Sequence, residues 1–394
     1  MNVLMVHNSV NTKGGDDVYV RGLADQGDRY GLRFSTVFAV ETNKSIEFNY
    51  NGEVSVVSRC DASKYLHQLT DKLSSELINI QTNYSVSVAN ACVRILPTVK
   101  TTHATDTVCP GHLKFLRKSG VPCEITYSWK CLASGFSEGC CTRHPIRFLQ
   151  MYRGINAENQ ELSEKYKAIV VMSEYIREQV IHAGTLGEKI NVVPYSTPVY
   201  NGPVGTTDEK RHIVFAGRVA EIKGPHVMIR ALVPVLKRYD NVVIDIVGDG
   251  PQRSHLMTLI ADEGLENRVI LHGWQDREQT LSKINSAYLV VFPSIYPEAF
   301  GIVGIEAMMR GKPVIGFDVG GVRTWLRSGE TGILLQSSEH EKLRESVIQL
   351  LEDPALYKKF STNAARVARR EFSPDAHFAG LKNVYEKSLA TLHV

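Results

Sequence analysis

Short apolar runs rich in β-branched residues alternate with helix-length amphipathic stretches along most of this chain. The runs expected to be strands are Val3–His7, Ser35–Ala39, Leu77–Ile80, Ile169–Met172, Asn191–Val193, His212–Ala216, Val242–Val247, Val269–Leu271, Leu289–Phe292 and Pro313–Gly316. Between them lie helical patterns such as Pro225–Tyr239, which has Pro in its first turn. Strands that alternate with helices and are apolar on both faces form parallel sheets, so the pattern predicts an α/β architecture.

A length of 394 residues exceeds one comfortable hydrophobic core, which favours two domains. The stretch Pro198–Asp208 is rich in Pro, Gly and small polar residues, as linkers are. We therefore expect an N-terminal domain over residues 1–198 and a C-terminal domain over 199–373. Two similar α/β halves would bind ligands at the carboxyl ends of strands that face a central cleft.

The composition excludes several classes of protein. Hydrophobic residues make up 43% and charged residues 22%, and the net charge of +3 gives no signature of a nucleic-acid partner. The stretch Met1–His7 has the pattern of a first strand and not of a signal peptide, and the sequence has no apolar run of membrane-spanning length. A cytoplasmic protein is expected. Contact with a membrane surface stays open, because separate segments can assemble a basic face.

A basic turn follows the expected strand His212–Ala216. Gly217-Arg218 comes directly after the strand, and Lys223-Gly224 precedes a helix that opens with Pro. A guanidinium fork, an ammonium and a helix N-terminus together make a seat for a diphosphate. The alternative is an ordinary solvated turn, since single basic turns are common on protein surfaces.

Two carboxylates, Glu298 and Glu306, bracket a glycine-punctuated apolar segment after the expected strand Leu289–Phe292. If a helix begins just after Glu298, eight residues are slightly over two turns, and both carboxylates lie on roughly one side. The neighbours of Glu306 are apolar: Ile302, Val303, Ile305 and Met309. A carboxylate among core residues needs a partner, so we expect Glu306 to be paired and not simply exposed.

The region from about 212 to 335 resembles the nucleotide-sugar-binding domain of family 4 retaining glycosyltransferases, which have the two-domain GT-B fold. Four landmarks occur in the family's order: Gly-Arg-x4-Lys-Gly from Gly217, Gly-x-Gly-Pro from Gly248, Pro-Ser-x3-Glu-x7-Glu-Ala from Pro293, and a Gly-rich stretch from Gly320 to Gly332. The resemblance implies two Rossmann-like domains with parallel sheets facing a central cleft.

The resemblance also implies a role for individual residues. Arg218 and Lys223 would neutralise the diphosphate of the donor, and Glu306 would hold the ribose hydroxyls. Glu298 would hold hydroxyls of the transferred sugar, and Trp274 stands where such enzymes contact the base. The nearby backbone amides would be those of Phe300, Gly301 and Ile302.

The N-terminal half matches the family more diffusely. In Lys13-Gly14-Gly15, the resemblance implies that the backbone at Gly15 touches the donor phosphate; a plain flexible turn is the alternative. His103 ends a Thr-Thr-His element after the strand-like Leu96–Val99, and the resemblance places this histidine beside the sugar in a catalytic role. A purely structural histidine is the other interpretation. The family's Pro-Asn-Gly-Val-Asp hinge is replaced by Pro194–Pro198, so its details do not carry over.

No Asp-x-Asp triplet occurs in the sequence, although metal-dependent sugar transferases of the other major fold use one. We therefore expect a metal-independent retaining hexosyl- or N-acetylhexosaminyltransferase without a cofactor, with a UDP-sugar as the donor. Its catalytic residues would be His103, Glu298, Arg218 and Lys223. The acceptor is not identified: a small molecule, a lipid or a glycan would each fit. A non-catalytic nucleotide-sugar-binding subunit of another transferase is the alternative function.

Five of the seven cysteines fall in the expected insertion of about residues 104–160: Cys109, Cys123, Cys131, Cys140 and Cys141. The first four could hold a structural Zn²⁺ in a loop without its own core. Against this, no CxxC pair occurs, and spacings of 13, 7 and 8 residues fit no standard zinc knuckle. Reduced cysteines without metal are favoured. A last helix, roughly Pro374–Leu389 within residues 374–394, is expected to pack back on the N-terminal domain.

Overall fold

The computed structural model describes residues 1–8, 15–42, 45–81, 85–202, 210–337 and 339–390, and it divides into two compact units. Unit 1 comprises Met1–Ser119, Cys123–Pro194 and His377–Val394, and unit 2 comprises Gly120–Pro122 and Tyr195–Ala376. Each unit has its own sheet. Part of the predicted linker, residues 203–209, lies outside the described residues.

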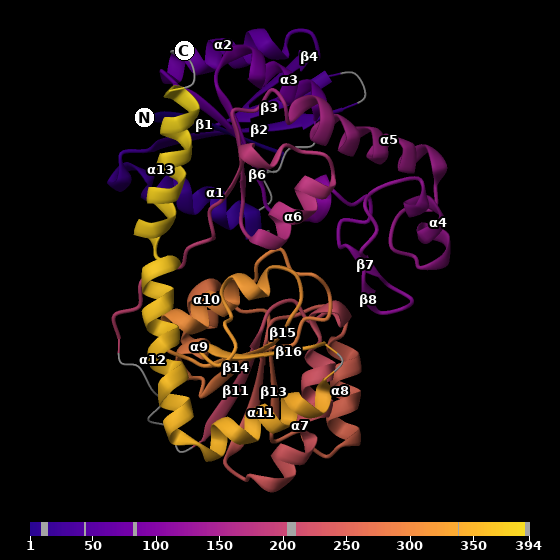
Figure 1. Cartoon of the computed structure of the whole chain (residues 1–394), viewed down its shortest axis with the longest axis vertical. Helices are drawn as coiled ribbons and strands as arrows, with labels where there is room; N and C mark the ends of the chain where they lie inside the picture. Colours follow the sequence, from indigo (N-terminus) through magenta and orange to yellow (C-terminus); the bar gives the residue numbers. More distant parts are fainter. Residues whose placement is uncertain (9–14, 43–44, 82–84, 203–209, 338, 391–394) are drawn as a thin grey trace. The chain divides into compact units, whose positions relative to one another are not determined.

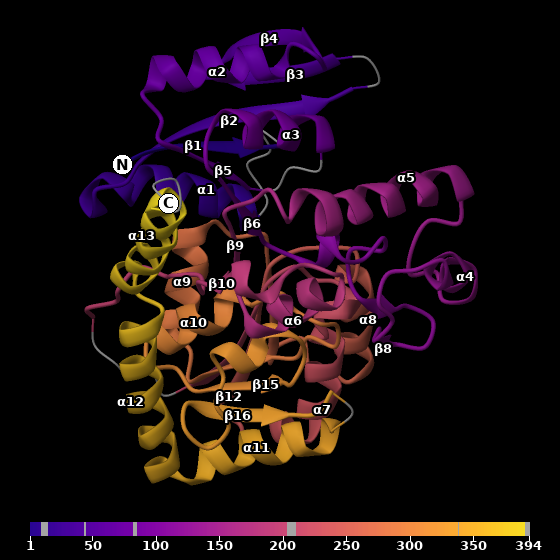
Figure 2. The ribbon, with the colours of Figure 1, turned by 45° about the horizontal axis from the view of Figure 1, so that its top comes forward.

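Unit 1 is built on an eight-stranded sheet in the order β10-β9-β6-β5-β1-β2-β3-β4 (Figure 2). The strands are β1 (Asn2–His7), β2 (Arg33–Glu41), β3 (Ser45–Tyr50), β4 (Glu53–Ser58), β5 (Leu77–Ile80), β6 (Thr98–Thr102), β9 (Ala168–Val171) and β10 (Ile190–Val192). All neighbouring pairs from β10 to β2 are parallel, and β2-β3-β4 is antiparallel. The central strand β1 is almost wholly buried, because apolar side chains cover both of its faces.

The helices of unit 1 connect these strands (Figure 1). They are α1 (Gly15–Gln26), α2 (Ala62–Leu73), α3 (Val86–Ile95), α4 (Lys130–Ser137), α5 (Pro145–Asn156) and α6 (Glu174–His182). Two short strands, β7 (Phe115–Leu116) and β8 (Val121–Pro122), precede α4. Helices α3 and α6 begin where Ser85 and Ser173 accept backbone N–H groups of the first turn.

The last helix, α13 (Pro374–Ala390), contributes most of its length to unit 1. The ring of Phe378 stacks on Tyr30 with centroids 4.3 Å apart, and Asn79 donates a hydrogen bond of 2.5 Å to the hydroxyl of Tyr385. Both aromatic side chains of α13 are buried. The end of the chain therefore completes the core of unit 1.

Unit 2 contains a six-stranded, wholly parallel sheet in the order β13-β12-β11-β14-β15-β16. The strands are β11 (Arg211–Ala216), β12 (Val242–Val247), β13 (Val269–Gly273), β14 (Leu289–Phe292), β15 (Val314–Phe317) and β16 (Gly332–Leu335). The chain runs outward from β11 to β13 and then returns to the other side of β11 at β14. Such a reversal is where an open parallel sheet binds its ligand, beyond the carboxyl ends of the two strands.

Helices cover the sheet of unit 2 and link its strands (Figure 1). They are α7 (Pro225–Arg238), α8 (Arg253–Asp262), α9 (Arg277–Ser286), α10 (Ile302–Met309), α11 (His340–Glu352) and α12 (Pro354–Glu371). Helix α9 opens with a capping box formed by Asp276 and Gln279. That cap fixes the start of α9 and therefore the position of Arg277, its first residue.

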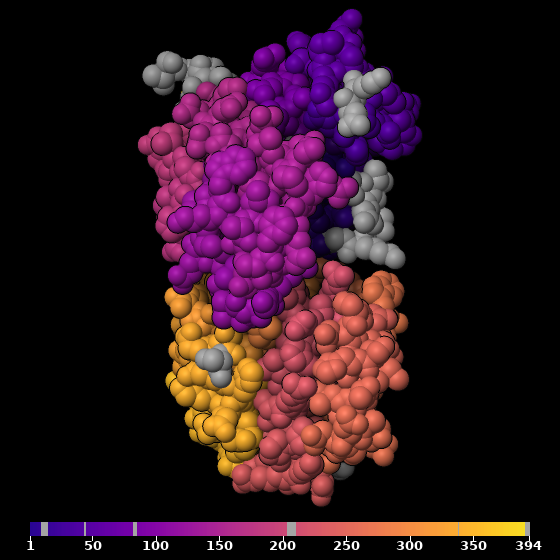
Figure 3. All heavy atoms as spheres, turned by 90° about the vertical axis from the view of Figure 1, so that its right-hand side faces the viewer, coloured from indigo at the N-terminus to yellow at the C-terminus, as the bar shows by residue number. Residues whose placement is uncertain are grey.

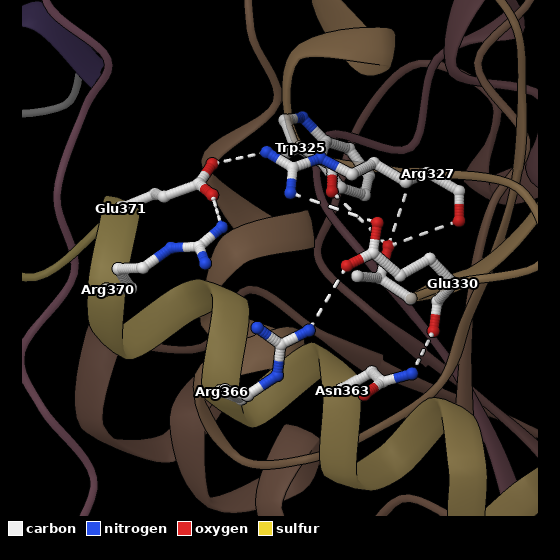
Figure 4. A network of polar contacts seen from close by, with 8 residues as sticks. Trp325, Arg327, Glu330, Asn363, Arg366, Arg370 and Glu371 are labelled. Atoms are coloured by element: carbon white, nitrogen blue, oxygen red, sulfur yellow. Dashed lines mark hydrogen bonds and ion pairs between the residues drawn. The ribbon is translucent and has the colours of Figure 1, made fainter.

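Ion pairs tie α12 to the turn before β16 in unit 2 (Figure 4). Arg327 pairs with Glu371, and Arg366 donates to Glu330 across 3.2 Å. The side-chain amide of Asn363 donates to the backbone oxygen of Glu330. This network joins α12 to the turn before β16, while α12 also packs on α10 and α11.

Most of the expected strands agree with the structure within one or two residues, but two details of the sheet in unit 1 differ. The strand before His103 is Thr98–Thr102 and not Leu96–Val99, so the histidine follows the strand directly. The β3–β4 hairpin was not anticipated. Among the described residues, no helix is both long and apolar enough to cross a bilayer.

Candidate functional site

The loops that follow β11 and β14 meet at the reversal point of the unit 2 sheet. The amide of Ile295 donates to the backbone oxygen of Ile222 across 2.9 Å. Gly224 has a left-handed φ of +69°, and a Cβ there would lie 2.0 Å from the backbone oxygen of Pro293. Only glycine allows this approach. The close packing brings Lys223, at the end of one loop, to the other loop.

The carboxylate of Glu298 is the centre of this site. It accepts hydrogen bonds from Nζ of Lys223 at 2.7 Å, from the hydroxyl of Ser294 at 2.5 Å and from the hydroxyl of Tyr296 at 2.9 Å. Glu298 is only 4% exposed. Three donors hold the carboxylate in one orientation, because a buried charge is stable only when it is paired and hydrogen-bonded.

The protonation states at this site follow from the same contacts. Burial alone disfavours the ammonium of Lys223, but Glu298 and Tyr296 more than offset it and raise the pKa of Lys223. Burial and the neighbouring carboxylate raise the pKa of Tyr296. The site therefore holds a charged lysine and a neutral tyrosine at neutral pH. Nζ of Lys223 also lies 5.0 Å from the centre of the Tyr296 ring.

Glu306 is buried and paired, as its apolar neighbours predicted. It is 5% exposed, and Nη2 of Arg277 lies 2.9 Å from its Oε1. Nη1 of Arg310 donates to the backbone oxygen of Glu306 at 3.1 Å. Burial raises the pKa of Glu306, and the charges of Arg277 and Arg310 oppose that rise. The side chain of Arg277 is nearly half exposed, so this arginine lies between the buried carboxylate of Glu306 and the solvent.

The helix that carries Glu306 starts later than expected. Helix α10 begins at Ile302 and not just after Glu298, because Gly301 precedes it with a φ of +94°. Glu298 therefore lies on an irregular loop, and the two carboxylates do not share one helical face. Phe300 is buried, and its backbone oxygen accepts a hydrogen bond from the indole of Trp325 at 2.6 Å. This bond fixes the entry to α10.

The glycine-rich turn after β15 supports Glu298 from behind. The amide of Gly321 donates to the backbone oxygen of Glu298 at 2.7 Å, and Gly320 forms a bridge with it. Gly320 has a φ of +58°, and a Cβ there would lie 2.3 Å from the same oxygen. The turn after β12 is packed equally closely, because a Cβ at Gly248 would lie 1.9 Å from the backbone oxygen of Gly217.

Arg218 and Trp274 both lie beside carboxyl ends of strands and are exposed. Arg218 follows β11, and Trp274, 70% exposed, follows β13. His272, next to the tryptophan, is turned to the buried Asp245, which also binds His212. Of this loop, only the tryptophan presents a large side chain for an outside ligand to contact.

His103 lies in unit 1 at the carboxyl end of β6. Its Nε2 is 2.8 Å from Oε1 of Gln81, which can only accept, so Nε2 carries the hydrogen. The ring packs edge-on against Tyr19 with centroids 5.1 Å apart. Burial, which outweighs the attraction of Asp16, lowers the pKa of His103 to about 3. The imidazole is therefore neutral at physiological pH.

Unit 1 also contains a cavity of about 300 Å³. Helix α5 lines it with Gln150, Met151 and Gly154, and the buried Lys100 lies at its wall, 3.7 Å from the carboxylate of Glu158. Gly15 opens α1, and a Cβ there would meet nothing within 4 Å. Lys13 and Gly14 lie outside the described residues.

The five cysteines of the insertion gather around one small cavity of about 20 Å³, and all seven cysteines of the chain are free thiols. The Sγ atom of Cys141 lies 2.9 Å from the backbone oxygen of Cys131. Burial raises the pKa of Cys131 and of Cys141. Among the described residues, no group of three or more histidine, cysteine, aspartate or glutamate side chains is arranged to hold a metal ion.

Sequence reasoning missed two residues of the site, Arg277 and Arg310. Nothing in their sequence neighbourhood separates them from other arginines of the chain, since both act on Glu306 from outside its motif. Their roles follow from a three-dimensional fact, the burial of that carboxylate. Tyr296 and Ser294 stood inside the quoted motif, but their hydrogen bonds to Glu298 were not foreseen.

Comparison with known proteins shows which protein family the region around this site resembles. Residues 200–367 match the family described as Glycosyl transferases group 1. The α-D-kanosaminyltransferase of Streptomyces kanamyceticus is 33% identical over 180 residues, which are 46% of each chain. The D-inositol 3-phosphate glycosyltransferase of Nocardia farcinica is 30% identical over 254 residues, 60% of this chain and 56% of that one. The chain thus spans about half the length of the curated relatives it matches.

Solved structures resemble the chain over almost its whole length. Anabaena HepE in complex with UDP-glucose has a TM-score of 0.66 at 20% identity and covers 100% of this chain and 99% of its own. Sucrose-phosphate synthase from Thermosynechococcus elongatus has a TM-score of 0.68 at 19% identity, with 99% of both chains covered. At these identities the likeness shows the fold, which is that of GT-B glycosyltransferases.

Proposed function

We propose, on the premise that residues 200–367 match the glycosyl transferases group 1 family, that the protein is a retaining glycosyltransferase with a UDP-linked sugar as its donor. The sugar would pass to an acceptor hydroxyl of a small molecule, a lipid or a glycan. The single observation that carries the proposal is the ion pair between Lys223 and Glu298 at the reversal point of the unit 2 sheet.

The pair can do two parts of the chemistry. The ammonium of Lys223 would stabilise the charge that develops on the departing diphosphate, and Arg218, exposed beside it, would add a second cation. Glu298, held by Ser294 and Tyr296, would accept hydrogen bonds from hydroxyls of the transferred sugar. When the donor binds, its phosphate and hydroxyls would replace the contact that lysine and glutamate now make with one another.

Glu306 would bind the nucleotide end of the donor. Its carboxylate is buried and fixed by α10, so two adjacent ribose hydroxyls could donate to it with little loss of side-chain entropy. Arg277 would move aside, because it is half exposed and can be solvated. The exposed ring of Trp274 would contact the base. The UDP complexes of HepE support a uridine donor.

The acceptor site is proposed to lie in unit 1, at the cavity lined by α5. Gly154 lines this cavity, and a Cβ at this position meets nothing within 4 Å, so Gly154→Leu adds bulk to the cavity without a clash in the helix. The variant should raise the KM for the acceptor and leave donor affinity unchanged. An unchanged KM would place the acceptor elsewhere.

Turnover decides between a transferase and the alternative, a non-catalytic nucleotide-sugar-binding subunit. Release of nucleoside diphosphate from UDP-, GDP- and ADP-sugars should be measured with and without EDTA, with the anomeric configuration of products followed by NMR. The proposal expects release from one donor class, insensitivity to EDTA and retention. Binding of a donor without any turnover in the presence of candidate acceptors would favour the subunit.

A further inference from the structure

The chain's positive charge is concentrated in one segment, which belongs to unit 1 except for Gly120–Pro122. Residues 111–153 contain seven Lys and Arg and two Glu, a net charge of +5, whereas the remaining residues contain 38 basic and 40 acidic side chains, a net charge of −2. The net charge of +3 for the whole chain therefore conceals a local excess of positive charge. We call residues 111–153, which include β7, β8, α4 and most of α5, the basic projection.

The basic projection also exposes large apolar side chains. Trp129 is 57% exposed, Phe136 is 60% exposed and Ile146 is 63% exposed. Trp129 and Phe136 are seven residues apart at α4, so they lie on one face of that helix. In the space-filling view, this part of the chain forms a broad continuous surface (Figure 3).

The exposed tryptophan is held in place and is not a loose surface residue. Its ring stacks on Tyr152 of α5 with centroids 5.2 Å apart, and Phe148 lies 5.7 Å away. Phe148 is fully buried, so Trp129 is the outer edge of an aromatic cluster. Keeping such a ring in water has a free-energy cost that covering the surface would remove.

Three basic side chains of the projection also lack an ion-pair partner among the described residues. Arg117, Lys130 and Arg147 are exposed and take part in no ion pair with another described residue. Arg327 and Arg366 of unit 2, in Figure 4, are by contrast each paired with a carboxylate. Unneutralised cations beside exposed aromatic rings match a partner that is anionic and has an apolar layer underneath.

The projection is closely packed on itself. A Cβ at Gly111 would lie 2.1 Å from the backbone oxygen of Cys140, and one at Gly135 would lie 2.9 Å from Sγ of Cys141. These approaches close the loop on itself around the small cavity between the thiols. A segment without long helices or strands is thereby packed as a compact element.

We propose that the basic projection docks the protein on the surface of a bilayer that contains anionic lipids, with Trp129 and Phe136 inserted at the headgroup level. Tryptophan is enriched at that depth because its ring is apolar and its N–H is polar. Lys130 and Arg147 would bind lipid phosphates, and such contacts weaken with salt. This docking is independent of the sugar-transfer proposal.

Vesicle flotation of the full chain tests the proposal. Vesicles of phosphatidylcholine alone and of phosphatidylcholine with one third phosphatidylglycerol should be compared at low and high salt. Trp129→Ser combined with Phe136→Ser should lower the partition coefficient onto anionic vesicles about tenfold or more. Lys130→Glu combined with Arg147→Glu should abolish the preference for anionic vesicles.

Matched variants on unit 2 serve as controls. Met257→Ser removes an apolar side chain that is 56% exposed, and Lys358→Glu reverses an exposed charge, so both should bind vesicles as the wild type does. Circular dichroism should show that every variant is folded. Equal binding by the projection variants and the controls, or no binding of the wild type to any vesicle, would overturn the proposal.

Fluorescence gives a second readout. The chain has three tryptophans, of which Trp325 is buried, so Trp274→Phe leaves Trp129 as the exposed one. Anionic vesicles should shift its emission to the blue, and the further change Trp129→Phe should remove the shift. A preference for nucleic acid over vesicles, or a shift that persists without Trp129, would contradict membrane docking at this surface.

Discussion

Nζ of Lys223 lies 2.7 Å from Oε1 of Glu298, although 75 residues separate the two along the chain. The sheet order explains the meeting, because β11 and β14 are neighbours and each residue follows one of them. A cation for a diphosphate and a carboxylate for hydroxyls are thereby held ready at one point. Glu298 keeps the lysine charged, and the contact holds both side chains in place until a ligand binds.

The first prediction concerns the charge of Glu298. Glu298→Gln keeps the size of the side chain but removes the charge, so kcat should fall about 10²- to 10³-fold, as for other preorganised electrostatic groups. Donor affinity should change less than kcat. Steady-state kinetics and calorimetric donor binding measure the two separately. Glu330→Gln, in the network of Figure 4, is the control and should retain activity; an unchanged kcat in Glu298→Gln would remove this residue from the chemistry.

The second prediction uses the pair of Arg277 and Glu306. Glu306→Ala should weaken nucleotide binding about 10- to 100-fold, the value of one or two hydrogen bonds to a charged group. Arg277→Ala should lower the free energy of unfolding by about 1–3 kcal/mol, because it leaves a buried carboxylate unpaired.

A double-mutant cycle checks the coupling of that pair. With both changes together, the loss of stability should be smaller than the sum of the single losses. Calorimetry for binding and urea titration for stability give the two quantities. Additive losses would show that the 2.9 Å contact between the two side chains contributes little in solution.

The third prediction concerns the packing beneath α10. A Cβ at Gly304 would lie 2.2 Å from the Trp325 ring, so Gly304→Ala should destabilise the protein by about 1–3 kcal/mol. It should also weaken donor binding, because Glu306 lies on the same helix. Gly22→Ala, in the middle of α1, is the matched control and should stabilise by about 0.5–1 kcal/mol, since its Cβ meets only a side-chain atom 3.9 Å away. Equal effects of the two changes would contradict the packing argument.

The fourth prediction concerns acid stability of unit 1. Burial lowers the pKa of His103 to about 3 and that of His377 to about 4. The unfolded chain binds these protons near pH 6.5 and the folded chain does not, so stability is complete above pH 6.5 and falls as the pH drops toward 4. Urea titrations at pH 7.5, 5.5 and 4.5 measure the slope.

A variant isolates one of these histidines. His377 donates through Nδ1 to the backbone oxygen of Pro194, and the side-chain amide of asparagine offers a donor for the same oxygen. His377→Asn should therefore reduce the loss of stability between pH 6.5 and 4. His144→Asn changes an exposed histidine and should leave the slope as it is. A slope that His377→Asn does not alter would locate the acid sensitivity elsewhere.

Sequence reasoning predicted the fold class and the burial of Glu306 better than it predicted local geometry. Apolar runs reveal buried parallel strands, so β11 and β14 were found almost to the residue. The start of α10 was wrong by several residues, because the positive φ of Gly301 depends on its packing against Phe292 and not on the local sequence. The β3–β4 hairpin carries charges and exposed valines at the edge of its sheet, a weak pattern for a strand.

The candidate site was accessible to sequence reasoning only in part. Lys223 and Glu298 stood in recognisable motifs, and burial of Glu306 followed from its apolar neighbours. Arg277 could not be found in this way, because its ion pair with Glu306 depends on how α9 packs against α10. The thiols around one cavity likewise come together through close backbone approaches at Gly111 and at Gly135 of α4, which no spacing rule describes.

The most direct test of the central claim is calorimetric titration of UDP-, GDP- and ADP-sugars into the wild type, Lys223→Ala and Glu306→Ala. The account predicts that one class of nucleotide sugar, the UDP-linked one, binds the wild type, and that each variant weakens binding about tenfold or more. Binding of no nucleotide sugar to the folded wild type, or equal binding by all three proteins, would contradict the donor site described at Lys223, Glu298 and Glu306.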